Sequence, residues 1–153
     1  MRVDYFTAAP GAAHAMIGLE GYLNKEATGD DKLPKRLLEL VKIRASQLNQ
    51  CAYCLDMHSK DARALGETEQ RIYALSAWRE TPFFDLRERA ALSWTEALTR
   101  LEPSAVTEAL FEQVHAQFND RELSDLTLAI CSINAWNRFG VAFEPEVGSY
   151  SPA

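Results

Sequence analysis

Cysteine is scarce in this chain. Three thiols in 153 residues are too few, and too oddly numbered, for the framework of a small secreted disulfide-rich domain. Long hydrophobic runs are also missing: the segment Met1–Asp4 has an early acid and no apolar stretch typical of a secretory signal, and no run approaches the length of about 20 residues that a membrane-spanning helix needs. We therefore expect a cytoplasmic protein that does not enter the membrane.

Positive charge is also in short supply. The 16 Lys and Arg residues are outnumbered by 22 Asp and Glu residues, which gives a formal net charge of −6. The chain shows no basic run, and this argues against a nucleic-acid partner. The chain is 47% hydrophobic, and its length is close to that of one typical domain. It can therefore bury one hydrophobic core without the help of a metal or a disulfide. We expect residues 1–153 to form a single domain, with a core from about residue 10 to 145 and an irregular tail over residues 144–153.

The spacing of the apolar residues is helical throughout, and no segment alternates in the manner of a half-buried strand. Turn-forming residues separate blocks of helical length, so the sequence predicts an all-α bundle of about six or seven helices. Asp85, with Glu88 three residues later, resembles a capping box. The expected helices cover about residues 8–26, 34–49, 51–65, 67–77, 86–101, 103–118 and 123–141.

One short motif concentrates the reactive side chains. Cys51, Cys54 and His58 are spaced i, i+3 and i+7, so in a helix with about 100° per residue they fall within an arc of about 60°. Two thiols one turn apart can form a disulfide once one of them is oxidised. An adjacent imidazole can take the thiol proton near neutral pH, and a place at the start of a helix favours the thiolate.

Two other interpretations of these cysteines stay open. Together with the histidine they could ligate zinc, although all three ligands would come from one helix and a structural zinc site needs four. The remaining histidines, His14 and His115, are far away in the sequence. Alternatively, the cysteines could be small buried apolar groups, because free cysteine is commonly interior. This interpretation suits Cys131, which lies in an apolar segment and which we expect to be buried.

Three polar residues outside the motif have mainly structural interpretations. Glu39 lies off the apolar stripe of its helix, and its position alone predicts a pair with Lys35 or Lys42 on a solvated face. Asn134 and Asn137 lie on the apolar face of the last helix. We expect these asparagines to brace another helix through buried hydrogen bonds.

Taken with these residues, the sequence resembles the AhpD-like alkylhydroperoxidase branch of the carboxymuconolactone decarboxylase family. The resemblance depends on Glu39, which is followed after eleven residues by Cys51-x-x-Cys54-x-x-x-His58. Segments 86–92 and 134–138 support it more loosely, and it covers residues from about 10 to 145. It implies an all-helical domain that assembles into homo-oligomers, trimers or hexamers, with the thiol pair near the subunit contacts.

The resemblance also implies a role for each residue of the motif. Cys54 is the nucleophile that attacks the peroxide, Cys51 the resolving thiol, His58 the base that deprotonates Cys54, and Glu39 the carboxylate that accepts or orients the proton. Tyr53 departs from the family pattern, which has a second histidine between the cysteines. A tyrosine hydroxyl can hydrogen-bond the relay or a peroxide oxygen. It is a poor proton shuttle, however, because it loses its proton only far above neutral pH. We therefore expect weaker activity, or activity toward another oxidant.

The resulting hypothesis is a thiol-dependent peroxidase that reduces hydroperoxides through a dithiol–disulfide cycle. Such a cycle requires an external dithiol as reductant, and it needs no flavin, haem or metal. Two alternatives stay open. The chain could be a redox switch or disulfide-exchange protein without peroxidase activity, or it could be a lactone decarboxylase on the same scaffold, in which the thiols are incidental.

Overall fold

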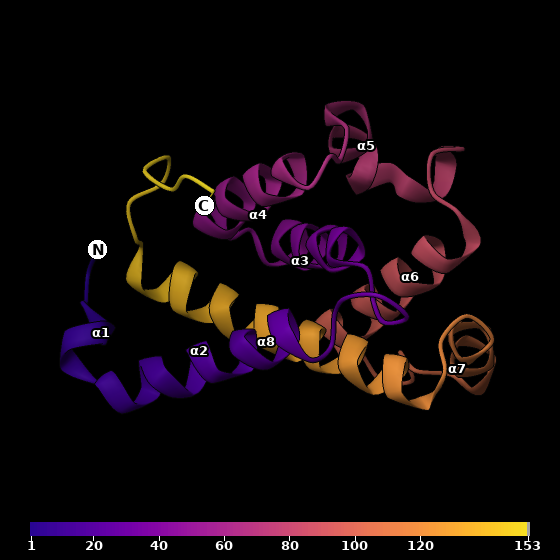
Figure 1. Cartoon of the computed structure of the whole chain (residues 1–153), viewed down its shortest axis with the longest axis horizontal. Helices are drawn as coiled ribbons and strands as arrows, with labels where there is room; N and C mark the ends of the chain where they lie inside the picture. The colour runs from indigo at the N-terminus through magenta and orange to yellow at the C-terminus, as the bar shows by residue number, and fades with distance from the viewer. Residues whose placement is uncertain (153) are drawn as a thin grey trace.

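The computed structural model describes residues 1–152, which form a bundle of helices without a β-sheet. The predicted all-α fold class is confirmed. Helix α3 runs through the middle of the bundle and contacts α4, α6 and α8 (Figure 1). In chain order the elements are α1 (Tyr5–Ala8), α2 (Pro10–Lys25), α3 (Lys35–Asn49), α4 (Ala52–Ala64), α5 (Glu69–Ala74), the 3-10 helix η1 (Leu75–Glu80), α6 (Leu86–Arg100), α7 (Glu108–His115) and α8 (Asp120–Phe143).

The described residues contain eight α-helices and one 3-10 helix, rather than six or seven helices. One addition is the short α1, whose first turn is capped by the Asp4 carboxylate through the backbone N–H groups of Phe6 and Thr7. The other arises because the expected helix over residues 67–77 is divided into α5 and η1, with non-helical backbone angles at Ala77.

The sequence predicted a helix that begins at Pro103, but α7 begins at Glu108. Its cap is Thr107, whose hydroxyl group accepts a hydrogen bond from the backbone N–H of Leu110. By contrast, the predicted capping box at the start of α6 is present, with Asp85 and Glu88 each bonded to the other's backbone N–H.

Helix α3 is buried on all its faces, along the ten consecutive residues 37–46. A helix surrounded in this way is normally apolar all round, yet this stretch contains three charged residues. Each is paired with a residue of a different helix, because an unpaired buried charge would be very costly. The pairs are Glu39–His58, Lys42–Glu20 and Arg44–Glu96.

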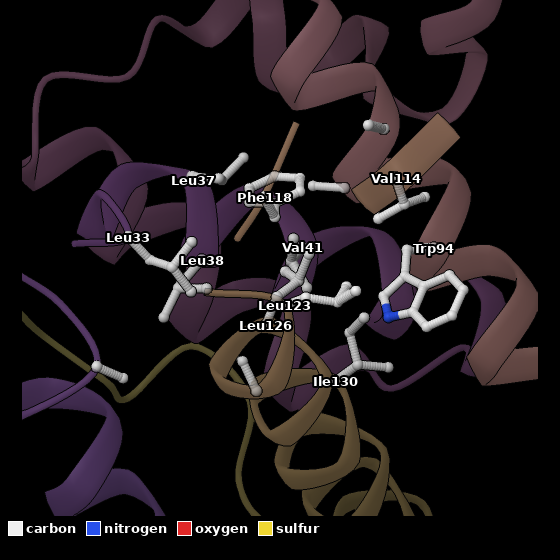
Figure 2. Packing of buried hydrophobic residues seen from close by; sticks show 14 of the residues in the cluster. Leu33, Leu37, Leu38, Val41, Trp94, Val114, Phe118, Leu123, Leu126 and Ile130 are labelled. Carbon is white, nitrogen blue, oxygen red and sulfur yellow. The ribbon is translucent and has the colours of Figure 1, made fainter. Parts of the chain in front are cut away.

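The largest apolar cluster lies where α3, α6 and α8 meet. Leu38 and Val41 of α3 pack there with Trp94 of α6 and with Leu126 and Ile130 of α8 (Figure 2). Burying one leucine or isoleucine side chain contributes about 1.5–3 kcal/mol. This cluster therefore fixes α3 against α8, which matters because α3 ends at the cysteine motif.

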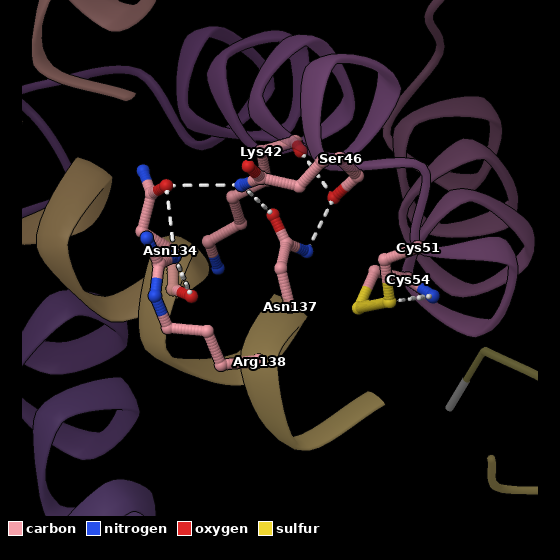
Figure 3. Close-up of a disulfide and its surroundings, with 8 residues drawn as sticks. Lys42, Ser46, Cys51, Cys54, Asn134, Asn137 and Arg138 are labelled. Atoms are coloured by element: carbon pink, nitrogen blue, oxygen red, sulfur yellow. Dashed lines mark hydrogen bonds between the residues drawn. A yellow bond between two sulfur atoms is a disulfide. The ribbon is translucent and has the colours of Figure 1, made fainter. Parts of the chain in front are cut away.

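Asparagine side chains add a polar brace at that end of α3. Asn49 donates from Nδ2 to Oδ1 of both Asn134 and Asn137, at 2.9 Å each. Asn137 in turn donates to Ser46 Oγ at 2.9 Å (Figure 3). The expectation that Asn134 and Asn137 brace another helix is confirmed, and the brace holds the last turn of α3 against α8.

The two ends of the described chain lie on the same side of the bundle (Figure 1). Arg2 forms an ion pair with Glu144, and its backbone N–H donates to the carbonyl of Phe143. Beyond α8 the tail has no regular secondary structure, as predicted, and Lys60 of α4 holds it by donating to the carbonyl of Tyr150 at 2.9 Å. Within residues 1–152, no helix has both the length and the hydropathy required to cross a membrane.

Candidate active site

The candidate site begins at the tight connection between α3 and α4. Gln50 adopts the left-handed conformation, with φ 55°, and ends α3. Cys51 then caps α4, and its Sγ accepts a hydrogen bond from the backbone N–H of Cys54 at 3.4 Å. Cys54 therefore lies in the first turn of α4, where unpaired N–H groups and the helix dipole stabilise a thiolate. The expected position of the thiols at a helix start is confirmed.

The two cysteines form a disulfide, with Cα atoms 5.4 Å apart (Figure 3). The bond is packed between α3 and α8, against Ala45 and Ile133. Cys51 is 1% exposed and Cys54 is 4% exposed. Because the sulfurs are bonded to each other, this form of the protein does not offer them as separate zinc ligands, and the zinc interpretation finds no support in the geometry.

His58 and Glu39 are brought together from the two helices of this hairpin. His58 Nδ1 lies 2.8 Å from Glu39 Oε2, and both side chains are buried. Burial alone would raise the pKa of Glu39, but the hydrogen bond and charge of His58 and the charge of Lys42 outweigh it, so the pKa lies below its ordinary value. The prediction from spacing that Glu39 lies on a solvated face is wrong, whereas the arrangement implied by the family resemblance agrees with the geometry.

A second buried pair adjoins the first. Lys42 Nζ donates to Glu20 Oε2 at 2.9 Å and lies 3.6 Å from Glu39 Oε1. Burial lowers the pKa of Lys42, but the carboxylates of Glu39 and Glu20 outweigh this effect and raise it above its ordinary value. Lys42 therefore stays a cation beside the Glu39–His58 pair.

These groups line one cavity of about 350 Å³. Cys54 and His58 reach it from α4, and Trp136 and Gly140 reach it from α8. The cavity contains an ionic part and an apolar, largely aromatic part, which suits a small organic molecule with one polar end. Its remaining lining residues are Tyr5, Phe6, Glu20, Asn24, Glu39, Lys42, Tyr53, Met57, Asp61 and Pro145.

Asp61, one helical turn beyond His58, completes the polar part of the cavity. The ligand atoms of Glu39, His58 and Asp61 lie within 4.8 Å of one another, so these residues could hold a metal ion. The ammonium group of Lys42 already provides positive charge beside Glu39, and Tyr150 Oη donates to Asp61 Oδ1 at 2.6 Å. The carboxylates of Glu39 and Asp61 thus have protein partners, and the chemistry below uses no metal.

Other residues singled out from the sequence lie elsewhere. Cys131 is exposed, so the expectation that it is buried is wrong. His14 is also exposed, and His115 pairs with Asp120 at the surface, far from the motif in the sequence. Tyr53 lines the cavity next to Cys54, where its hydroxyl can meet a bound molecule.

Sequence reasoning did not place Glu20, Lys42, Asp61 or Gly140 in the site. The expected pairing of Glu39 with Lys42 is present, at 3.6 Å, but it is buried and not on a solvated face. For two of them a signal existed, because Lys42 lies three residues after Glu39 and Asp61 three residues after His58, each on the same helix face. Glu20 and Gly140 come from α2 and α8. Their approach depends on the packing of distant helices, which no local pattern predicts.

A model of the carboxymuconolactone decarboxylase family matches residues 10–97, which is more than half of the chain. The chain belongs to the carboxymuconolactone decarboxylase family. The matched segment includes Glu39, Cys51, Cys54 and His58, whereas Trp136 and Gly140 of the cavity lie in α8 outside it. The uncharacterized protein YdfG of Bacillus subtilis is 41% identical over 148 residues, which are 97% of this chain and 97% of that protein.

Two solved structures extend this result to the AhpD-like members of the carboxymuconolactone decarboxylase family. The first is a protein of unknown function from Agrobacterium tumefaciens, described as a candidate AhpD antioxidant defence protein. It is 39% identical, with a TM-score of 0.87, and the match covers 99% of this chain and 98% of that one. The second is an uncharacterized peroxidase-related protein from Silicibacter sp. TM1040, 27% identical with a TM-score of 0.77 over 89% of this chain and 70% of that one. The AhpD-like resemblance is thereby confirmed.

Proposed function

We propose that this protein is a thiol-dependent peroxidase that reduces organic hydroperoxides. The observation that carries the proposal is the shared cavity, in which Cys54 of a disulfide-forming pair lies with a hydrogen-bonded His58–Glu39 pair. A thiolate, an imidazole and a carboxylate in one partly apolar cavity are the groups that peroxide reduction by sulfur requires.

In the reduced protein, the cycle begins with proton transfer from the Cys54 thiol to His58. Glu39 accepts the hydrogen bond of His58 Nδ1 and thereby leaves Nε2 free to take the proton. The Cys54 thiolate attacks the terminal oxygen of ROOH. The O–O bond breaks, a sulfenic acid forms on Cys54, and His58 returns the proton to the leaving alkoxide to give ROH.

The second half of the cycle forms the disulfide. The thiol of Cys51 attacks the sulfenic acid sulfur of Cys54, and water leaves. This arrangement is supported by the hydrogen bond from Cys54 N–H to Cys51 Sγ, which holds the resolving sulfur beside the first turn of α4. An external dithiol then reduces the disulfide and is itself oxidised, so the cycle balances without a cofactor.

Steady-state reduction of cumene hydroperoxide, with dithiothreitol as the donor, tests the proposal. We expect turnover in the wild type and none in Cys54→Ser, while Cys131→Ser serves as a matched control that keeps the wild-type rate because Cys131 lies outside the site. One equivalent of hydroperoxide should consume two thiols of the reduced chain. A rate that survives Cys54→Ser, or no turnover with a dithiol donor, would contradict the proposal and favour a redox switch or a decarboxylase.

A further inference from the structure

Lys42 is a buried charged residue for which the proposed cycle has no use. Its side chain is 5% exposed and lines the cavity. An ammonium group in such surroundings is costly unless it is paired. Lys42 has two partners, Glu20 at 2.9 Å and Glu39 at 3.6 Å, which lie on different helices. The position of Lys42 between them links the site to a helix that contributes no residue to the motif.

The link continues through the bundle as a chain of polar contacts. Ser132 of α8 donates to Glu20 Oε1 at 2.6 Å, and Lys42 donates to the other oxygen of Glu20. Lys42 then faces Glu39 Oε1, while the other oxygen of Glu39 faces His58. Each carboxylate thus uses its two oxygens for two different partners, which fixes the plane of the carboxylate.

We propose that Lys42 is a positioning residue for the Glu39–His58 pair, and that Glu20 sets how much of the lysine's positive charge reaches that pair. The inference rests on the proposed function, because it assigns Lys42 a part in the same relay. It concerns the charge and orientation of the pair, however, and not turnover itself.

The expected effects have opposite signs. Without the cation of Lys42, the Glu39–His58 pair binds its proton more tightly, because a nearby positive charge no longer opposes protonation. Without the anion of Glu20, the charge of Lys42 acts on the pair undiminished, and the pair binds its proton less tightly. A charge within about 4–6 Å of a titrating group shifts its midpoint by about one to three pH units, and because Glu39 lies between Lys42 and His58 we expect the lower end of this range.

Other titratable groups also face the pair, and the test leaves them unchanged. Cys54 belongs to the disulfide and does not titrate in the oxidised protein, and the residues of α8 that line the cavity, Trp136 and Gly140, carry no charge. The titratable or charged residues are Asp61 and Tyr53 of α4, Tyr5 of α1, Lys35 of α3 and Tyr150 of the tail.

The experiment is an NMR titration of the histidine Hε1 signals in the oxidised, full-length protein. The chain has three histidines, and His58→Gln identifies the signal of His58 by its loss. Compared with the wild type, we expect the midpoint of the His58 titration to rise by about one pH unit in Lys42→Met and to fall in Glu20→Gln. Lys42→Arg should restore the wild-type midpoint to within a few tenths of a unit. The exposed His14 and His115 serve as internal references.

A double variant guards against a folding defect. Lys42→Met leaves the carboxylates of Glu20 and Glu39 without the cation between them. The double variant Glu20→Gln/Lys42→Met, which removes both charges, is therefore measured as well. Its His58 midpoint should lie closer to that of the wild type than the midpoint of Lys42→Met does. Midpoints that do not move, or that move in the same direction in Lys42→Met and Glu20→Gln, would overturn the inference. If the midpoint rises in Lys42→Met and falls in Glu20→Gln, as expected, but the wild-type protein does not reduce hydroperoxide, the proposed function alone is refuted.

Discussion

Gly140 of α8 lies directly against the disulfide of the α3–α4 hairpin. A Cβ atom at this position would come within 2.6 Å of Cys51 Sγ and 3.4 Å of Cys54 Sγ. Only a residue without a side chain allows this approach. The backbone of α8 thereby covers Cys51, whereas Cys54 keeps its contact with the cavity.

Gly140→Ala should therefore destabilise the oxidised protein. Overpacking of a closed site costs about 1–3 kcal/mol, which exceeds the gain of about 0.5–1 kcal/mol from replacing glycine by alanine within a helix. Gly21→Ala in α2 is the matched control, because a Cβ there meets nothing within 4 Å and only the helical gain remains. Urea unfolding of the oxidised variants measures both effects. Equal stabilisation by the two substitutions would show that Gly140 does not contact the sulfurs.

The cysteine motif and its helix were predictable from the sequence, because both depend on local spacing. The i, i+3 and i+7 positions of Cys51, Cys54 and His58 put the groups on one helix face, and the tight turn at Gln50 lies where the break was expected. Glu39 was not predictable in the same way. Its burial depends on α4 folding back along α3, which is a property of the hairpin and not of either helix alone.

Cys131 shows a different kind of error. The segment around it is apolar, and this led to the expectation of burial. The buried face of α8, however, runs through Leu126, Ile130, Ile133 and Asn137, and Cys131 is one residue off this stripe and is exposed. At about 100° per residue, one step is enough to turn a side chain from the core to the surface. Periodicity was therefore a better guide than local hydrophobicity.

Glu96 should make a pH-dependent contribution to stability. It is buried and accepts hydrogen bonds from Arg44, Trp78 and Arg79. Burial would raise the pKa of Glu96, but these partners outweigh it and hold the pKa below its ordinary value of 4.5. Since the folded pKa is depressed, the stabilisation is fully present above pH 4.5 and is lost as the pH falls through the folded pKa.

We expect Glu96→Gln to lower the free energy of unfolding by about 3 kcal/mol near neutral pH, because the buried guanidinium of Arg44 loses its anion. The difference from the wild type should shrink as the pH is lowered below 4.5, which urea unfolding at a series of pH values measures. The control is Glu112→Gln, at an exposed position. A difference that stays constant down to pH 3 would rule out the depressed pKa.

The relay predicts slower thiol chemistry when either member of the Glu39–His58 pair is changed. His58→Ala removes the base, and Glu39→Gln removes the carboxylate that orients the imidazole, so less of Cys54 is thiolate at neutral pH. A rise of one unit in the thiol pKa lowers the thiolate fraction about tenfold. The alkylation rate of Cys54 by iodoacetamide at pH 7 in the reduced protein measures this loss, with the exposed His14→Ala as control. Unchanged rates in both variants would remove these two residues from the proposed mechanism.

The three cysteines should differ in the order of their alkylation, because the structure gives each one different surroundings. In the oxidised protein only the exposed Cys131 should react, since Cys51 and Cys54 form a disulfide. After reduction Cys54 should react next, because it lines the cavity at the start of α4, where a thiolate is favoured. Cys51, which is 1% exposed and covered by Gly140, should react last. Peptide mass spectrometry after timed alkylation of Cys131→Ser follows the two site thiols alone, and faster modification of Cys51 than of Cys54 would reverse the assignment of nucleophile and resolving thiol.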